Sequence, residues 1–368
     1  MGKSSDGKPL TLTNVPRDIV EKILKHCDYR AIASLRKTNK SLREFLDKSN
    51  WQCFVSCIHV QQREDHAVLK LRLGESTEVI SIEYRSPEGS QTHYEDEIWQ
   101  YYEKMQQITH FMNSFSYDFG LLLEHTKTSV LDEFCLEFDN VDLVLSTSWQ
   151  DASLVAFWDR VQAMLTGVKP IKTRSLHMTF AMMNQVVSFL PLFDAADLKK
   201  LKLTPMRQQD VRGPNFMALR QDLALNSLAE GDQWRSAEEL VVEDAYVYIA
   251  VEHLFHFKKI DICVDLIEFA DMESIIRALI NRGEMEIHFV VTMELWLVDI
   301  EERYGEALES KFYFHIPGVD CILVMFKTEE KIEMTLIPRM NVPDEATIVN
   351  LDDLNPQERL VPLIEDLF

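Results

Sequence analysis

Glycine is scarce in this chain: 11 glycines occur in 368 residues, and none forms a glycine-rich loop ahead of a helical pattern. Neither a Gly-Lys-Ser/Thr P-loop nor a Gly-x-Gly-x-x-Gly fingerprint is present, so backbone amides have no recognisable site for cradling phosphate groups. The chain also lacks a Gly-x-Ser-x-Gly elbow and a cysteine in a known nucleophile context. The sequence gives no support for catalysis, and we expect neither an enzyme nor a bound cofactor.

Long apolar runs are missing too. The most continuous one, residues 287 to 300, is interrupted by four polar or charged side chains and falls short of a membrane span. The first ten residues lack the apolar core of a secretory signal. Six cysteines at irregular positions are typical of reduced thiols, so we expect no disulfides. These absences predict a protein of the cytoplasm, the nucleus or both, with no membrane contact.

Charge is divided unequally along the chain, whose net charge is -22. Residues 1 to 50 hold 11 Lys and Arg against 6 Asp and Glu, a net charge of +5, which leaves -27 for the remainder. Because neutralising nucleic-acid phosphates needs a basic surface, the acidic remainder disfavours nucleic-acid binding. The basic head favours an acidic protein partner. For the acidic remainder, a basic or amphipathic ligand and simple solubility are equally good explanations.

Three short amphipathic helices are predicted between Val15 and Leu46. Asn14 can cap the first helix and Pro16 suits its first turn. Its apolar face then recurs at helical spacing, through Ile19, Val20, Ile23, Leu24 and Cys27. Ile32 and Leu35 mark a second helix, and Leu42, Phe45 and Leu46 mark a third. A bundle this small has little interior, so we expect it to be completed by a partner or by the next domain.

These residues resemble an F-box, an adaptor-binding motif. The resemblance rests on Val15-Pro16-x-Asp18-Ile19-Val20-x-x-Ile23-Leu24, Leu35-Arg36-Lys37 and Ser41-Leu42-Arg43. It differs from the usual pattern in having Val15 before the proline and Cys27 where leucine is common. An ordinary three-helix bundle without a partner fits the same periodicity. The resemblance implies that a Skp-type adaptor is bound by Val15, Pro16, Ile19, Val20, Ile23, Leu24, Leu35, Arg36 and Leu42, some of which also form the core of the bundle.

Beyond Trp51 the pattern predicts a larger α/β domain, residues 55–340. Alternation around residues 74–77 indicates a hairpin, and residues 95–123 read as a helix. Strand-like segments follow at residues 134–138, 176–180, 198–203, 240–242, 260–263, 286–291, 312–314, 322–326 and 332–336. Several share a Leu-x-Leu kernel at unequal intervals, which predicts an irregular leucine-rich-repeat-like array. A compact α/β sandwich with a mixed sheet fits these segments as well.

Three stretches of this domain resemble the FTH domain of a large nematode family of F-box proteins. They are Leu190-Pro191-x-Phe193 leading to Leu198-x-x-Leu201-x-Leu203, Gln233-Trp234-x-x-Ala237 leading to Leu240-Val241-Val242, and Leu254-x-His256-Phe257-x-x-Ile260-x-Ile262. The resemblance implies an F-box at residues 9–50 with an F-box-associated domain behind it. Residues 341–368, with 7 acidic residues and 1 basic one, predict an acidic tail. Its apolar end, Leu360 to Phe368, is expected to fold back on the domain, and a short docking helix is the alternative.

Two groups of residues have metal-like spacing. Cys53-x-x-x-Cys57-x-His59, with His66 further on, would place both cysteines on one helix face, but a structural zinc site normally shows paired close spacings on both sides. His253-x-x-His256 lacks the internal glutamate of a hydrolytic motif. We expect buried helical cysteines and a family pattern around His256, and no metal site.

The two resemblances together imply a non-catalytic substrate-recognition subunit of a Skp-cullin-F-box ubiquitin ligase. Its partners would be the Skp-type adaptor, a cullin and a protein target whose identity the sequence does not give. An adaptor without ligase function, which bridges or sequesters proteins with the same domains, is the alternative. A metal-dependent or hydrolytic enzyme that uses the His and Cys groups is the least favoured.

Overall fold

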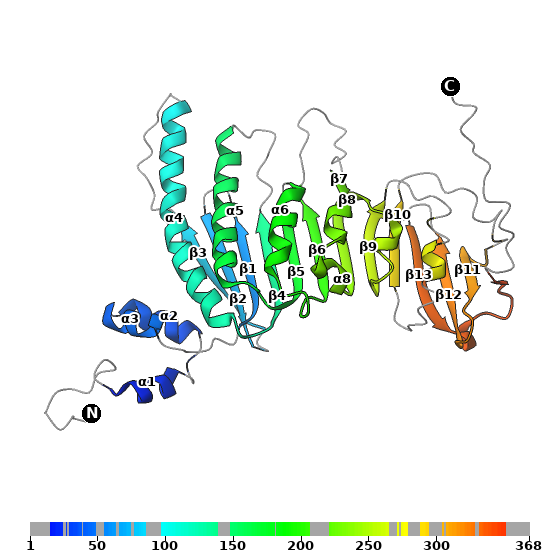
Figure 1. The fold of residues 1–368 in the computed structure, drawn as a ribbon, viewed down its shortest axis with the longest axis horizontal. Coiled ribbons are helices and arrows are strands. Elements are labelled where there is room, and N and C mark those ends of the chain that lie inside the picture. The colour runs from blue at the N-terminus through cyan, green and yellow to red at the C-terminus, as the bar shows by residue number, and fades with distance from the viewer. Residues whose placement is uncertain are drawn as a thin grey trace. The chain divides into compact units, whose positions relative to one another are not determined.

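The computed structural model describes most of the chain, as two compact units (Figure 1). The described residues are 15–24, 27, 29–38, 40–48, 55–63, 66–74, 77–85, 97–138, 148–180, 182–206, 221–264, 271, 274–278, 288–293, 304, 307–327 and 331–350. The first unit comprises Met1–Phe180, Ser188–Leu198 and Gln208–Gly213. The second comprises Ala181–Val187, Lys199–Arg207 and Pro214–Phe368.

The first unit opens with the three predicted short helices, which are α1 (Arg17–Leu24), α2 (Tyr29–Thr38) and α3 (Lys40–Lys48). Apolar residues recur at helical spacing in each, and five of them are buried: Val20, Leu24, Ile32, Leu42 and Leu46. The expectation for Cys27 was wrong. Helix α1 ends at Leu24, and the Cys27 amide donates to the Leu24 carbonyl over 3.1 Å, beyond the helix end.

A five-stranded sheet follows in the same unit. Its strands are β1 (Val55–Gln62), β2 (His66–Leu73), β3 (Val79–Arg85), β4 (Leu131–Phe138) and β5 (Thr173–Phe180), in the order β3-β2-β1-β4-β5. The predicted hairpin is confirmed as β2 and β3, and Gly74 in its turn has a φ of 52°, which glycine adopts without strain. Strands β1, β4 and β5 run parallel. The helix expected around Cys57 was wrong, because that residue lies in β1.

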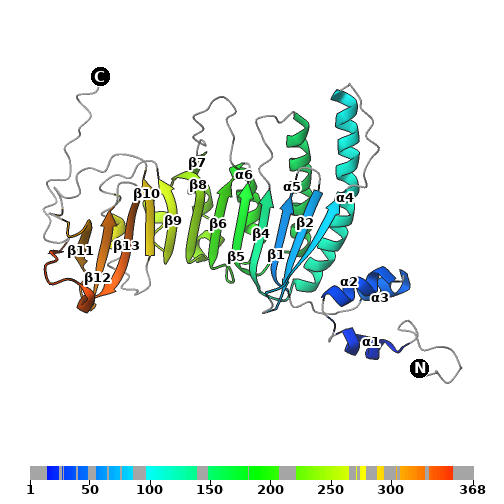
Figure 2. The same ribbon diagram turned by 180° about the vertical axis from the view of Figure 1, so that it is seen from behind.

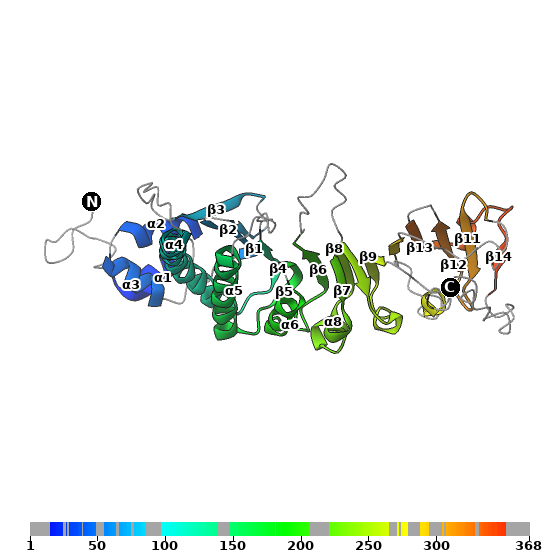
Figure 3. The same cartoon turned by 90° about the horizontal axis from the view of Figure 1, so that it is seen from above.

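Two long helices cover one face of this sheet: α4 (Glu97–Thr126), predicted from the sequence, and α5 (Ser148–Val168). Phe119 of α4 contacts Phe134 of β4, and Phe115 contacts Phe157 of α5, with all four rings fully buried. Figures 2 and 3 show both helices on the same side of the strands. Within the part of the chain that the structure describes, no helix covers the opposite face.

The second unit contains a sheet that is parallel at first and antiparallel later. Its order is β6-β8-β9-β10-β13-β12-β11-β14, and β7 pairs with β8. The strands are β6 (Lys200–Pro205), β7 (Gln221–Ala224), β8 (Glu239–Tyr248), β9 (Lys259–Val264), β10 (His288–Met293), β11 (Lys311–His315), β12 (Cys321–Lys327), β13 (Lys331–Pro338) and β14 (Ile348–Val349). The short helices of this unit are α7 (Asn226–Ala229), α8 (Asp232–Ser236), η4 (Val251–His253) and η5 (Arg339–Asn341). Helix α6 (Met183–Phe189) begins in the second unit, and η3 (Leu190–Leu192) belongs to the first.

The predicted α/β class is confirmed, with the short helices ahead of a larger sheet-rich part. Strands β6, β8, β9 and β10 lie side by side in chain order and parallel, as a repeat array requires. Antiparallel strands in both units make each sheet mixed. Residues 341–350, predicted as the start of the tail, contain β14, which pairs with β11 beside the cluster of Tyr313, Ile322 and Val324. The apolar stripe at residues 360–368 lies outside the described residues.

None of the described helices has both the length and the apolar character that crossing a bilayer requires.

Candidate functional site

Helix α1 is apolar on two sides, one buried and one open. Val20 and Leu24 are each 2% exposed, whereas Ile19 and Ile23 are 45% and 40% exposed. Because residues four apart lie on one helix face, Ile19 and Ile23 form a continuous surface, to which the exposed Pro16 adds the preceding turn. The Pro16 carbonyl accepts from the amides of Ile19 and Val20, so the proline starts the helix. We call Pro16, Ile19 and Ile23 the α1 stripe.

The remaining residues that the F-box resemblance implies lie deeper. Val15 and Leu35 are half-buried, and Leu42 is buried in the bundle. Of the nine residues implied as adaptor-binding, the structure therefore exposes the three of the α1 stripe. Val20 and Leu24 lie on the buried side of the same helix.

Arg36 is held inside the unit, at the junction between the short helices and α4. Its Nε lies 2.8 Å from Asp47 Oδ1 of α3, and its Nη1 lies 3.1 Å from Asp118 Oδ1 of α4. The guanidinium carbon lies 5.3 Å from the centroid of the Tyr117 ring. The Tyr117 hydroxyl donates to Asp47, and the Tyr84 hydroxyl of β3 donates to Asp118 over 3.1 Å. We call these five residues the Arg36 bridge.

The charges in the Arg36 bridge stabilise one another. Burial by itself lowers the pKa of Arg36, but the carboxylates of Asp47 and Asp118 outweigh it, and the pKa is raised. The hydrogen bond to Asp47 raises the pKa of Tyr117. Because Arg36 is 8% exposed and holds two carboxylates, its guanidinium serves the internal junction.

Sequence reasoning missed four members of the bridge: Asp47, Tyr84, Tyr117 and Asp118. The available signal was Ser116-Tyr117-Asp118, a polar step between the apolar positions Phe115 and Phe119 of a predicted helix. That step indicates that part of α4 faces something other than its own sheet. It does not reveal that the partner is Arg36, which lies 82 residues earlier in the chain.

The described members of the first metal-like spacing, Cys57, His59 and His66, contact three different carboxylates. Cys53 lies outside the described residues. His66 Nε2 lies 3.0 Å from Glu83 in the hairpin, whereas His59 Nε2 lies 2.6 Å from Glu137 of β4. Cys57 instead contacts Glu133, where burial and that carboxylate raise the pKa of its thiol to about 11. The spacing was misleading for the secondary structure, because Cys57 and His59 lie on a strand and not on a helix.

The second spacing, His253 and His256, packs around a buried tryptophan. Trp234 Nε1 donates to the His253 carbonyl over 3.0 Å, and the Trp234 carbonyl lies 2.7 Å from His256 Nε2. The His256 ring also lies 4.0 Å from the ring of Phe257. The Gln233-Trp234 and His256-Phe257 stretches of the FTH resemblance therefore pack against each other in the second unit.

Comparisons with known proteins match both parts of the chain. A family model of the F-box domain matches residues 12–52, and one of the FTH domain matches residues 156–292. The chain is similar to F-box A protein 224 of Caenorhabditis elegans, with 23% identity over 324 residues that cover 86% of this chain and 77% of the relative. No solved structure matches the chain. The general role of F-box proteins is that of a substrate adaptor, and this chain is a nematode-type F-box protein with an FTH domain.

Proposed function

We propose that the chain is the substrate-recognition subunit of a Skp-cullin-F-box ubiquitin ligase. The observation that carries the proposal is the α1 stripe, an apolar surface left open on a helix whose other side is already buried. It lies within the residues that match the F-box. The adaptor would cover the stripe, and the larger domain would hold a protein target.

Burial of the α1 stripe would contribute substantially to the free energy of adaptor binding. Burying the exposed part of Ile19 and Ile23 is worth about 1–2 kcal/mol for each side chain. Basic residues in the first 50 positions give this end a net charge of +5, which favours encounter with an acidic adaptor. Val20 and Leu24 keep the helix in place from below, so they affect adaptor binding indirectly.

The Arg36 bridge would fix the orientation of the adaptor-binding helices relative to the sheet of the first unit. A recognition subunit accelerates ubiquitin transfer by raising the effective concentration of its target near the charged enzyme. That gain depends on geometry, because a loosely tethered target spends less time in position. The bridge joins α2 and α3 to α4 and β3, and so links the adaptor-binding end to the sheet.

The proposal also implies what the chain itself does not do. The chemistry of transfer would belong to the enzymes that the complex recruits. We propose a location in the cytoplasm, the nucleus or both, where such complexes meet reduced, unsecreted targets. Nucleic acid and membranes are not among the proposed partners.

The experiment is a binding titration between the full chain and a purified Skp-type adaptor. Replacing Ile19 and Ile23 together with Ala should weaken binding by about 30- to 700-fold, the equivalent of 2–4 kcal/mol. The matched control is Val79→Ala, because Val79 is a β-branched side chain that is 54% exposed on β3. Circular dichroism should show both variants folded. Equal binding by the double variant and the unchanged chain would refute the role of the stripe.

An assembly and ubiquitin-transfer assay distinguishes the ligase subunit from an adaptor without ligase function. Adaptor and cullin should assemble with the chain into one complex that transfers ubiquitin to a bound protein. Binding of adaptor without assembly on the cullin would instead indicate a bridging or sequestering protein.

A further inference from the structure

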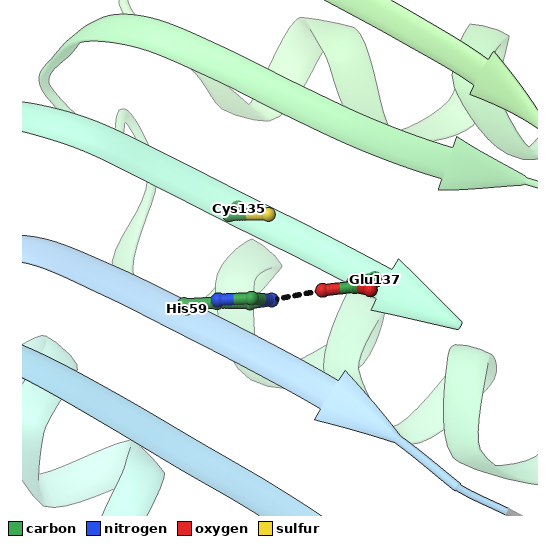
Figure 4. A group of neighbouring side chains, drawn as sticks. All are labelled: His59, Cys135 and Glu137. Atoms are coloured by element: carbon green, nitrogen blue, oxygen red, sulfur yellow. Dashed lines mark ion pairs between the residues drawn. The ribbon is translucent and has the colours of Figure 1, made fainter. Parts of the chain in front are cut away.

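The uncovered face of the first sheet carries a row of metal-ligating side chains. In the strand register, His59 of β1 lies opposite Cys135 of β4, and Cys135 lies opposite His177 of β5. Glu137 lies two residues beyond Cys135, and alternate strand residues share a face. Phe134 and Leu136 point the other way and are fully buried. Figure 4 shows His59 on one strand and Cys135 and Glu137 on the neighbouring one, with the ion pair between His59 and Glu137 drawn as a dashed line.

The distances bring three different donor atoms together. His59 Nε2 lies 2.6 Å from Glu137 Oε2, and one donor atom from each of His59, Cys135 and Glu137 lies within 4.8 Å of the others. Around a tetrahedral zinc ion with bonds of 2.0–2.3 Å, ligand atoms lie about 3.3–3.8 Å apart. Small side-chain rotations would therefore bring these atoms onto one ion. Cys135 is buried, whereas His59 and Glu137 are half-buried.

We propose that His59, Cys135 and Glu137 bind one zinc-class metal ion on this face. Imidazole, thiolate and carboxylate are all ligands that zinc accepts, whereas magnesium and calcium select oxygen donors alone. Three protein ligands leave a fourth position for water or a bound group. His177 Nδ1 lies 3.4 Å from Cys135 Sγ and acts as a positioning residue that orients the thiolate.

A purely structural role for the same residues is the competing explanation. His59 and Glu137 then form an ion pair, and Cys135 shares a hydrogen bond with His177. The two explanations differ in what the thiol does. If a metal binds, loss of the Cys135 thiol lowers the affinity for the ion, whereas in the structural explanation the sulfur only packs and shares its hydrogen bond with His177.

The test uses the full chain, stripped with a chelator and titrated with Zn²⁺ and, separately, with Co²⁺. One equivalent of either metal should bind, and cobalt should show a thiolate charge-transfer absorption. Loss of an outer-shell partner typically costs 10- to 100-fold in metal affinity, so loss of a ligand in Cys135→Ser should cost at least about 100-fold and remove the absorption.

Two further variants keep the test decisive. His59→Gln changes a half-buried side chain, so it should fold even if Cys135→Ser does not, and it should also weaken zinc binding. Cys57→Ser is the matched control, because it removes a thiol from the same face of β1 that contacts Glu133 instead. The absence of binding by the unchanged chain, or equal affinity in the folded His59→Gln variant, would overturn the proposal. Loss of the cobalt absorption in Cys57→Ser alone would overturn the ligand assignment.

Discussion

Replacing Arg36 with Met should detach the short helices from α4 while leaving each helix formed. Met has a similar length and retains an apolar stem, so the change removes the charge and its donors with little loss of volume. The Asp47 and Asp118 carboxylates, both held by one guanidinium in the folded chain, would then face each other without a cation.

The magnitude follows from the burial of the three charges. Removing one partner of a fully buried ion pair costs about 3–5 kcal/mol, because the remaining charge stays desolvated. Here the Arg36 side chain is 10% exposed, but Asp47 and Asp118 are 18% and 33% exposed, so water can partly solvate them. We therefore expect a loss of about 2–3 kcal/mol in the free energy that holds the junction closed.

Hydrogen exchange is the assay, because it reports local opening in a chain that has two units. A loss of 2–3 kcal/mol should lower the protection of the α3 amides by about 30- to 150-fold. Arg85→Met is the control, because its ion pair with Glu83 joins two exposed side chains and should contribute little to stability. If both variants left α3 equally protected, the bridge would not hold the junction, and the reasoning would be refuted.

Three other outcomes follow from contacts in both units. Trp234→Phe should cost about 1–2 kcal/mol in urea denaturation, because the His253 carbonyl loses its indole donor. Ile348→Asp should cost about 2 kcal/mol and lower the melting temperature, since it places a charge on the apolar cluster beside β11. Asp47→Asn should lower the pKa of Tyr117, because the hydrogen bond to the Asp47 carboxylate raises it. A pH titration followed by ¹³C-tyrosine NMR measures this pKa, and the Tyr117→Phe variant assigns the signal. Because that pKa is raised above 10.0 in the folded chain, the stability contributed by this hydroxyl is present below pH 10.0 and is lost as the pH rises through the raised value.

The short helices and the hairpin could be predicted because their signals are local. Helical spacing fixes which side chains of residues 17–24 share a face, and the turn at Gly74 needs a residue that tolerates positive φ. Strand β1 shows how such a signal is misread. The spacing of Cys53 and Cys57 suggested a helix, whereas Ile58 and Val60 alternate with polar residues at the period of a strand. The alternation predicts the structure correctly, because residues 55–62 form strand β1, which pairs with β2 on one side and β4 on the other.

The contacts that define the candidate sites could not be predicted, because they join distant segments. Arg36 and Asp118 are 82 residues apart, and no local pattern selects one carboxylate among the 60 acidic residues. The row of His59, Cys135 and His177 depends on the register of three parallel strands, which a single sequence does not determine. The F-box resemblance implied that Arg36 is part of the adaptor-binding surface, whereas its burial and its two carboxylate partners place it at a junction.

Strand β4 separates the two candidate sites from each other. Phe134 faces the helices and contacts Phe119, the neighbour of Asp118 in the Arg36 bridge, whereas Cys135 faces the uncovered side. Because alternate residues of a strand point to opposite faces, a change at Cys135 leaves the Phe134 contact in place. The free-energy changes of Arg36→Met and Cys135→Ser should therefore add in the double variant, as they do for sites without shared partners. A clear departure from additivity would show that β4 transmits a change on the metal-ligating face to the helix that holds the F-box.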